Sequence, residues 1–318
     1  MTAPSKGNRR SGSKGDLVLK IVVGAAAIGI VALLIGLGLE LTSGSWLSIE
    51  TFGLGFITGS TWNSVTNTYN VLPALVGTLT ASAIALILGL PIGLGVAIFL
   101  SERAKGMRAG ATALGSLVEL LAAVPSVIYG LWGLFFLSPL LKADVEKPLH
   151  RYLGTIPIFS GTPFGLDFFT AGVILAIMII PTISAVSRNV LNAVPNSQRE
   201  AMYSLGATDW EVTRHAVLPY ARAGIFAGIV LGLGRALGET MAVTLVIGNT
   251  NAIPTSLFSP GQTISTLLAN QFFEAVNSTE RAALIEAGLV LLVITLLVNV
   301  VARGILSRFQ RGRGVGLE

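Results

Sequence analysis

The feature that most constrains this chain of 318 residues is a series of six apolar runs, each long enough to cross a lipid bilayer as a helix. About 20 mostly apolar residues suffice for such a span. Charged residues make up only 12% of the chain, against the roughly 25% of an ordinary soluble domain. The sequence therefore predicts an all-α membrane protein with six transmembrane helices, in these segments: Leu17–Leu41, Val71–Leu100, Ala111–Leu141, Asp167–Val186, Tyr220–Ile247 and Ala282–Val301.

The first apolar run has a cleavable signal peptide as its alternative interpretation. The apolar core of a signal peptide is only about 7–15 residues long, so the length of this run favours a membrane helix. The polar segment 1–16, rich in Gly and Ser, is predicted to be disordered. Residues 17–70 are predicted to hold the first helix and an outer loop, because Trp46, Trp62 and Tyr69 stand among polar side chains typical of a membrane–water interface.

The basic residues predict which side of the membrane each end faces. Of the 21 Lys and Arg residues, sixteen lie in the N-terminal segment, the 101–110 loop, the 188–222 region and the C-terminal tail. By the positive-inside rule both termini, including the basic tail 304–318, are predicted to be cytoplasmic. Arg235 is left inside the fifth span. The four cations on the opposite face are Lys142, Lys147, Arg151 and Arg281.

The chain lacks the side chains that most enzymes and metal sites need. It has no cysteine, which excludes disulfides and thiolate metal sites, and His150 and His215 are isolated. No nucleophile–base grouping is present. The basic clusters stand beside apolar runs, which favours membrane-flanking charge over nucleic-acid binding. We expect no enzymatic activity, no metal and no cofactor.

A polar interval between the fourth and fifth spans, Glu200–Pro219, has the signals of two short helices. A capping box pairs an N-cap Ser or Thr with a Glu three residues later, and a glycine in the left-handed conformation ends many helices. Proline is tolerated in the first turn of a helix. The interval is thus predicted to be a helix–glycine–helix elbow. Its signals are Ser197 with Glu200, Gly206 as C-cap, Thr208 with Glu211, and Pro219 in the first turn of the next helix.

Two charges in the fifth predicted span, Arg235 and Glu239, need an explanation, because an ionisable group at mid-bilayer costs at least ~2.5–3.5 kcal/mol. On a continuous helix they share one face of about 80° with Gly224, Gly228 and Gly232, and a glycine stripe is typical of a packed face. One interpretation is an ion pair that holds helices together. The interpretation we favour is that Arg235 offers a planar guanidinium to an anionic solute, while Glu239 holds that guanidinium in place.

Other polar groups in the spans are weaker candidates for the same path. Glu119 is interpreted either as a second partner of Arg235 or as a helix-packing group. The hydroxyls of Thr78, Thr80 and Ser126 are candidates by polarity alone. A weakly amphipathic run, Gln262–Ala275, is expected near the membrane surface.

The chain has no phosphate loop of the form Gly-x-x-x-x-Gly-Lys-Ser/Thr, so ATP-driven transport would need a separate motor chain that touches the elbow. Glu200-Ala201, Gly206 and Leu218-Pro219 resemble the Glu-Ala-Ala loop of ABC importer permeases, with departures at Met202 and Ala216. The resemblance implies that the elbow is a coupling helix that docks on the ATPase. The coupling residues it implies are Glu200, Ala201, Gly206, Thr208, Asp209, Glu211, Leu218 and Pro219.

Three further segments narrow the resemblance to the phosphate-specific branch of this family, the PstC permeases. They are FLSERA at 99–104, ELLAAVPSVIYGLWG at 119–133 and GLGRALGETMAV at 232–243. The resemblance implies a MetI-like type I permease domain over 71–303, in the cytoplasmic (inner) membrane, with the coupling loop at 197–219. It also implies a PstA-like second permease, a PstB-like ATPase dimer on the cytoplasmic face and a PstS-like extracytoplasmic phosphate-binding protein.

Two alternatives stay open from the residues alone. The same machine would suit another oxyanion, such as sulfate, molybdate or a phosphonate. A secondary anion transporter or channel that works without ATP is the second alternative, and inverted repeats with discontinuous helices would favour it. The sequence has no convincing internal repeat, and in a secondary transporter the elbow would have no partner.

Overall fold

The structure, a computed structural model, describes residues 14–103 and 108–311. In these residues six helices are long and apolar enough to cross a membrane, which confirms the expected all-α membrane fold. Most of the predicted disordered segment 1–16 and the end of the predicted basic tail 304–318 lie outside the described residues. Residues 14–16 belong to the first helix and residues 304–311 to the last one. The six candidate spans are Gly15–Phe52, Leu72–Arg103, Ser126–Leu153, Phe168–Asn192, Asp209–Gly238 and Ser278–Ile305.

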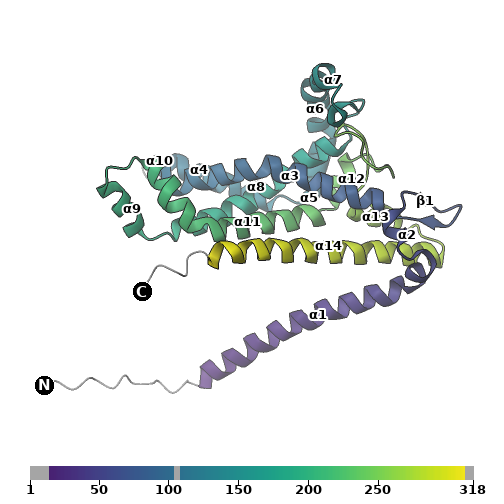
Figure 1. Ribbon diagram of the computed structural model, residues 1–318, viewed down its shortest axis with the longest axis horizontal. Coiled ribbons are helices and arrows are strands. Elements are labelled where there is room, and N and C mark those ends of the chain that lie inside the picture. The colour runs from purple at the N-terminus through teal and green to yellow at the C-terminus, as the bar shows by residue number, and fades with distance from the viewer. Residues whose placement is uncertain (1–13, 104–107, 312–318) are drawn as a thin grey trace.

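The first helix, α1 (Lys14–Phe52), is longer than the predicted first span. Its first half diverges from the bundle, and its last turns lie beside the last helix, α14 (Ser278–Arg311) (Figure 1). Gly53, with a φ of 52°, ends α1. The interface segment that follows contains α2 (Gly55–Thr58) and an antiparallel hairpin of β1 (Trp62–Asn63) and β2 (Thr68–Tyr69).

The centre of the bundle is the pair α3 (Leu72–Ile98) and α8 (Phe168–Asn192). A Cβ on Gly89 would lie 2.8 Å from the Ile179 side chain, and one on Gly93 would lie 3.2 Å from Ile183. The small residues therefore let the two helices approach closely. A π-helical turn, η1 (Phe99–Arg103), continues α3.

The third predicted span is broken rather than continuous. α4 (Arg108–Ala123) ends two residues before α5 (Ser126–Trp132), and Pro125 lies at the break as N-cap of α5. A proline disfavours helical backbone at the residue before it, which explains the interruption. The segment that follows the third predicted span is helical as far as Leu153. The elements after α5 are η3 (Gly133–Leu137), α6 (Ser138–Leu141), η4 (Lys142–Glu146), α7 (Lys147–Leu153) and η5 (Pro157–Phe159).

The predicted fifth span, Tyr220–Ile247, is wrong at both ends. Its helix begins earlier, because α10 (Asp209–Val212), the π-helical turn η6 (Thr213–Val217) and α11 (Leu218–Gly238) run on without interruption. It also ends earlier, at Gly238, and a separate helix α12 (Met241–Val246) follows. The predicted amphipathic run contains α13 (Ile264–Gln271), which packs on α3 and α14 through Ile264 and Leu267.

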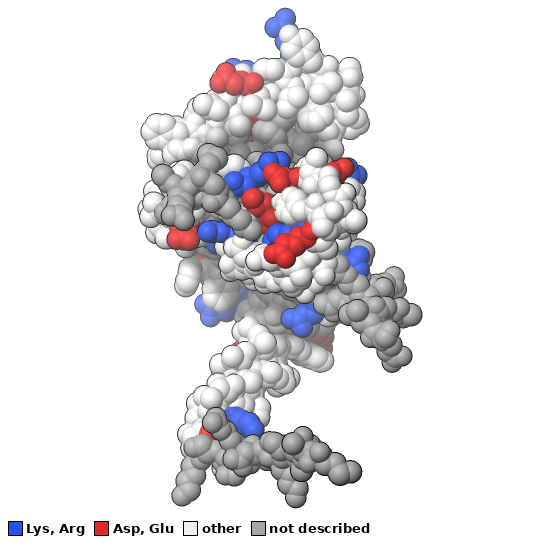
Figure 2. Space-filling model, turned by 90° about the vertical axis from the view of Figure 1, so that its left-hand side faces the viewer, with Lys and Arg blue, Asp and Glu red and all other residues white. Residues whose placement is uncertain are grey.

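The helical hairpin of α9 (Asn196–Ser204) and α10 forms one end of the molecule. The beginning of α1 and the end of α14 point to the same end, while α6, α7 and the β-hairpin lie at the other (Figure 1). Figure 2 views the α9–α10 end and shows basic and acidic side chains interspersed there. The beginning of α1 and the end of α14 therefore lie at the same end of the molecule as the elbow.

Candidate coupling elbow and substrate path

The elbow turns at Gly206, as predicted. Gly206 has a φ of 81°, and its N–H donates to the Tyr203 carbonyl at 2.9 Å. The Ala207 N–H donates to the Met202 carbonyl at 3.2 Å, which completes a Schellman motif at the end of α9. No other atom lies within 4 Å of a Cβ placed on Gly206, so its backbone conformation is what requires glycine.

One of the two predicted capping boxes forms. The Thr208 N–H donates to the Glu211 carboxylate at 2.8 Å, and Thr208 Oγ1 accepts from the Glu211 N–H at 3.4 Å. The predicted capping box of Ser197 and Glu200 is wrong, because α9 begins at Asn196 and Pro195 is its N-cap. Ser197 already lies in the first turn, where its hydroxyl is past the capping position.

Pro219 lies in the first turn of α11, as predicted. No loop precedes this helix, however, because the π-helical turn η6 runs directly into it and the Leu218 N–H donates to the Thr213 carbonyl. A proline inside an α-helix clashes with the carbonyl four residues earlier. The wider π turn directly before Pro219 relieves that crowding, so the helix continues through the Leu-Pro pair.

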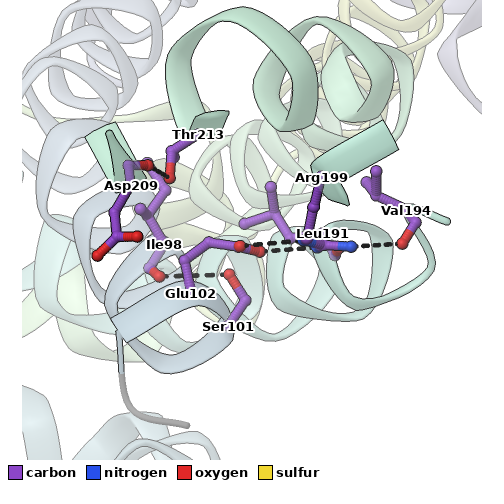
Figure 3. Close-up of polar contacts among 8 residues, drawn as sticks. All are labelled: Ile98, Ser101, Glu102, Leu191, Val194, Arg199, Asp209 and Thr213. Carbon is purple, nitrogen blue, oxygen red and sulfur yellow. Dashed lines mark hydrogen bonds and ion pairs between the residues drawn. The ribbon is translucent and has the colours of Figure 1, made fainter. Parts of the chain in front are cut away.

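The elbow is attached to the end of α3 by two ion pairs, of which Figure 3 shows the one between Arg199 and Glu102. The Arg199 guanidinium pairs with Glu102 in η1 at 2.9 Å, and both side chains are about nine-tenths buried. Arg103 pairs with Asp209 at 3.2 Å, but these side chains are 58% and 60% exposed. The Tyr203 hydroxyl donates to the same Asp209 carboxylate at 3.0 Å. The Arg199–Glu102 pair was not predicted from the sequence. The signal for it was the Glu-Arg dipeptide of FLSERA directly after an apolar span.

Arg235 lies in the last turn of α11, half-buried, and its Nη1 donates to Thr182 Oγ1 of α8 at 3.3 Å. Thr182 was not predicted, and its only sequence signal was its place after Pro181 in an apolar span. The glycine stripe is confirmed as a packed face. The stripe glycines Gly224, Gly228 and Gly232 lie against Val190, Val186 and Ile183 of α8, respectively.

Glu239 does not share a helical face with Arg235, because α11 ends at Gly238 and Glu239 has extended backbone. Its carboxylate accepts from the Ala242 N–H at 3.3 Å and thereby caps α12. An ion pair between Glu239 and Arg235 is not formed in the described residues. The i,i+4 bridge that the sequence leaves open is therefore not present in this conformation.

The remaining path candidates are placed differently from one another. Glu119 is exposed on α4 and is not bonded to Arg235. The Thr78 hydroxyl donates to the Ala74 carbonyl and accepts from the Ile264 N–H at 2.9 Å, so it fastens α13 to α3. Thr80 and Ser126 are half-buried, and Ser126 begins α5 at the helix break.

The two helix breaks lie near one another. A Cβ on Gly130 of α5 would lie 2.9 Å from the Ala242 Cα, so α5 packs closely on α12. The Tyr129 hydroxyl donates to the Leu121 carbonyl at 2.6 Å and satisfies a backbone group that the α4–α5 break leaves open. Tyr129 is also within electrostatic reach of Arg235. The cation thus stands where two broken helices meet.

Comparison with known proteins places this architecture in a family. The family described as "Binding-protein-dependent transport system inner membrane component" matches residues 89–313. The phosphate transport system permease protein PstC of Mesorhizobium japonicum is 45% identical over 303 residues, which cover 94% of this chain and 92% of that protein. The chain belongs to the PstC family. The PstC of Pasteurella multocida is 46% identical over 293 residues, which cover 91% of this chain and 90% of that protein.

Solved structures share the fold of this PstC-family chain at low sequence identity. A bacterial ABC transporter involved in the import of the acidic polysaccharide alginate has a TM-score of 0.58 at 18% identity, over 92% of this chain and 98% of that chain. The inward-facing MetNI methionine ABC transporter has a TM-score of 0.51 at 17% identity, over 75% and 94%. The fold is that of an ABC importer permease, and the chain is a transport subunit rather than an enzyme.

Proposed function

We propose that the chain is the permease subunit through which an ATP-driven importer moves inorganic phosphate across the cytoplasmic membrane. The relatives that this chain matches over 90% or more of their length are named phosphate transport system permease proteins. Phosphate is an oxyanion, and a guanidinium binds oxyanions well because it stays protonated and offers a planar fork of donors. The chain supplies the path for phosphate and the elbow that receives the motion of the ATPase, and another subunit hydrolyses ATP.

The observation that carries this proposal is the state of Arg235. Its guanidinium is half-buried between α11 and α8, and its hydrogen bond within the described residues is to a neutral hydroxyl, that of Thr182. Most of its five donors are therefore free to receive an anion. An isolated cation in a membrane protein is costly and faces the bundle interior or a water-filled path. We assign phosphate contact to Arg235, with Glu239 as the acidic group that limits how tightly the anion is held. Glu119 stays a candidate residue of the path.

We assign the α9–α10 end to the cytoplasm and to contact with the motor. Leu205 and Trp210 are 83% and 56% exposed there, beside the exposed Glu200. Large exposed apolar side chains on a polar end are typical of a protein–protein contact. The partners are a PstB-like ATPase dimer at this end, a PstS-like phosphate-binding protein at the α6–α7 end, and a PstA-like permease beside the 71–303 domain. The 197–219 segment is the coupling loop.

The mechanism that follows is alternating access. The binding protein releases phosphate into an outward-open cavity, and closure of the ATPase dimer pushes the elbow and reorients the helices. The coupling surface is Glu200, Ala201, Gly206, Thr208, Asp209 and Glu211, and Leu218 and Pro219 lead into α11, which carries Arg235.

Replacement of Arg235 tests the path directly. We expect Arg235→Ala to abolish uptake of labelled phosphate by vesicles that hold the full complex, because the anion loses its cation. Assembly with the ATPase, measured by co-purification, should persist. Thr182→Val is the matched variant: it removes the neutral partner of the guanidinium and should reduce uptake without abolishing it. Normal uptake by an assembled Arg235→Ala complex would remove Arg235 from the path.

A further inference from the structure

Arg199 is the only side chain of α9 that is buried, although it carries a positive charge. The other side chains of α9 are exposed or half-buried, so this helix has little apolar anchorage in the bundle. Charged side chains are almost never fully buried unless they are paired. The contacts of Arg199 therefore decide how firmly α9 is held.

The guanidinium of Arg199 is bonded on two sides (Figure 3). Its Nε and Nη2 donate to the two carboxylate oxygens of Glu102 at 3.2 and 2.9 Å. Its Nη1 and Nη2 also donate to the carbonyls of Val194 and Leu191 at the end of α8. The last carbonyls of a helix have no partner within it, and a forked pair with a carboxylate is both strong and geometrically specific.

These bonds connect α9 to the two central helices. Glu102 lies in η1, which ends α3, and Leu191 lies in the last turn of α8. α3 and α8 pack closely along their length, as at Gly89, so a displacement of one presses directly on the other. α8 also carries Thr182, whose hydroxyl meets Arg235. A continuous set of contacts thus runs from the elbow to the site of the anion.

The second limb of the elbow is attached differently. Gly206 separates α9 from α10, and the ion pair that joins α10 to η1, Arg103 with Asp209, is exposed. Exposed pairs are worth only about 0–1 kcal/mol. α10 is held by apolar packing instead, since Val212 is buried against Leu191 and its neighbours. The buried Arg199–Glu102 pair is the polar attachment that holds α9 itself.

We propose that Arg199 and Glu102 are positioning residues for transport. They transmit the displacement of α9 by the ATPase to the α3–α8 pair, and so to the Thr182 side of the Arg235 site. This inference rests on the proposed function of the elbow. Without the pair, α9 moves while the central helices stay behind, so the motor hydrolyses ATP without moving phosphate.

Two conservative variants test the pair without removing bulk. Glu102→Gln keeps the shape and removes the charge, and Arg199→Lys keeps the charge and removes the fork. Arg103→Gln is the matched control, because it breaks the exposed pair at the neighbouring position. Phosphate uptake and ATP hydrolysis are measured in the same vesicles, with both permeases, the ATPase and the phosphate-binding protein present. Assembly is checked by co-purification.

We expect the phosphate moved per ATP to fall about tenfold or more in Glu102→Gln and Arg199→Lys, equivalent to ~1.4 kcal/mol of lost coupling. The hydrolysis rate and the KM for the loaded binding protein should stay within about twofold, as should every value for Arg103→Gln. An unchanged ratio in assembled variants would overturn the inference, as would failure of both variants to assemble, which would assign the pair to folding. If the unsubstituted complex hydrolyses ATP but carries no phosphate, the proposed function fails instead.

Discussion

At the scale of single residues, the N-terminal end of α8 holds two buried carboxyl groups side by side. Glu146 and Asp167 are both fully buried. The Thr170 hydroxyl donates to Glu146, and the Thr170 N–H donates to Asp167, which is the N-cap of α8. One oxygen of each carboxyl group has no partner within the described residues. Two adjacent buried carboxylates cannot both be charged without a large cost, so the pair is stable only if it shares a proton.

Neutralising one member of this pair should therefore not weaken the fold. We expect Glu146→Gln to leave the melting temperature of the detergent-solubilised protein unchanged or to raise it, because the amide can donate to Asp167. Asp167→Ala should lower the melting temperature, because α8 loses its cap and with it about 1 kcal/mol or more of unfolding free energy. Asp144→Asn, an exposed position on the same turn, is the control. A clearly lower melting temperature for Glu146→Gln would show that its charge is needed.

At the scale of elements, the elbow depends on the left-handed backbone of Gly206. A β-branched residue in that conformation costs at least ~1–2 kcal/mol. Gly206→Val should therefore distort the turn between α9 and α10 and reduce the phosphate moved per ATP. Asn tolerates the left-handed region, so Gly206→Asn should keep coupling nearly intact. Equal coupling in the two variants would contradict the importance of this cap.

Most elements that depend on local sequence were predicted, apart from the Ser197–Glu200 box and the break at Pro125, and those that packing determines were not. The apolar runs, the Thr208–Glu211 box and the Gly206 cap depend on residues a few positions apart, and the structure contains all of them. The break at Glu239 could not be predicted in this way, because the close packing of α12 on α5 fixes it. The Arg199–Glu102 pair joins residues 97 positions apart, so the Glu-Arg dipeptide after the second span does not indicate which cation Glu102 meets.

The candidate site was predicted in part for the same reason. Arg235 stands out in any apolar run, and its glycine stripe correctly predicted a packed face. Its partner Thr182 is one of many hydroxyls in the spans, and only the approach of α8 to α11 selects it. Glu239 seemed to share the face of Arg235 only because the helix was assumed to continue.

At the scale of the whole molecule, the elbow and the cation stand at opposite ends of one helical run. That run extends from Asp209 to Gly238, and α8 beside it is tied to the elbow at one end and to Arg235 further along. A push on the α9–α10 end can therefore reach Arg235 through two helices. This arrangement suits a subunit that is driven from outside itself.

The central proposal is that the chain moves phosphate across the membrane when a partner subunit hydrolyses ATP. The most direct measurement is uptake of labelled phosphate and of labelled sulfate by vesicles that hold the full complex, with and without ATP. The account predicts ATP-dependent phosphate uptake that excess unlabelled phosphate suppresses and excess sulfate does not. Equal uptake of sulfate, or phosphate uptake that does not depend on ATP, would contradict it.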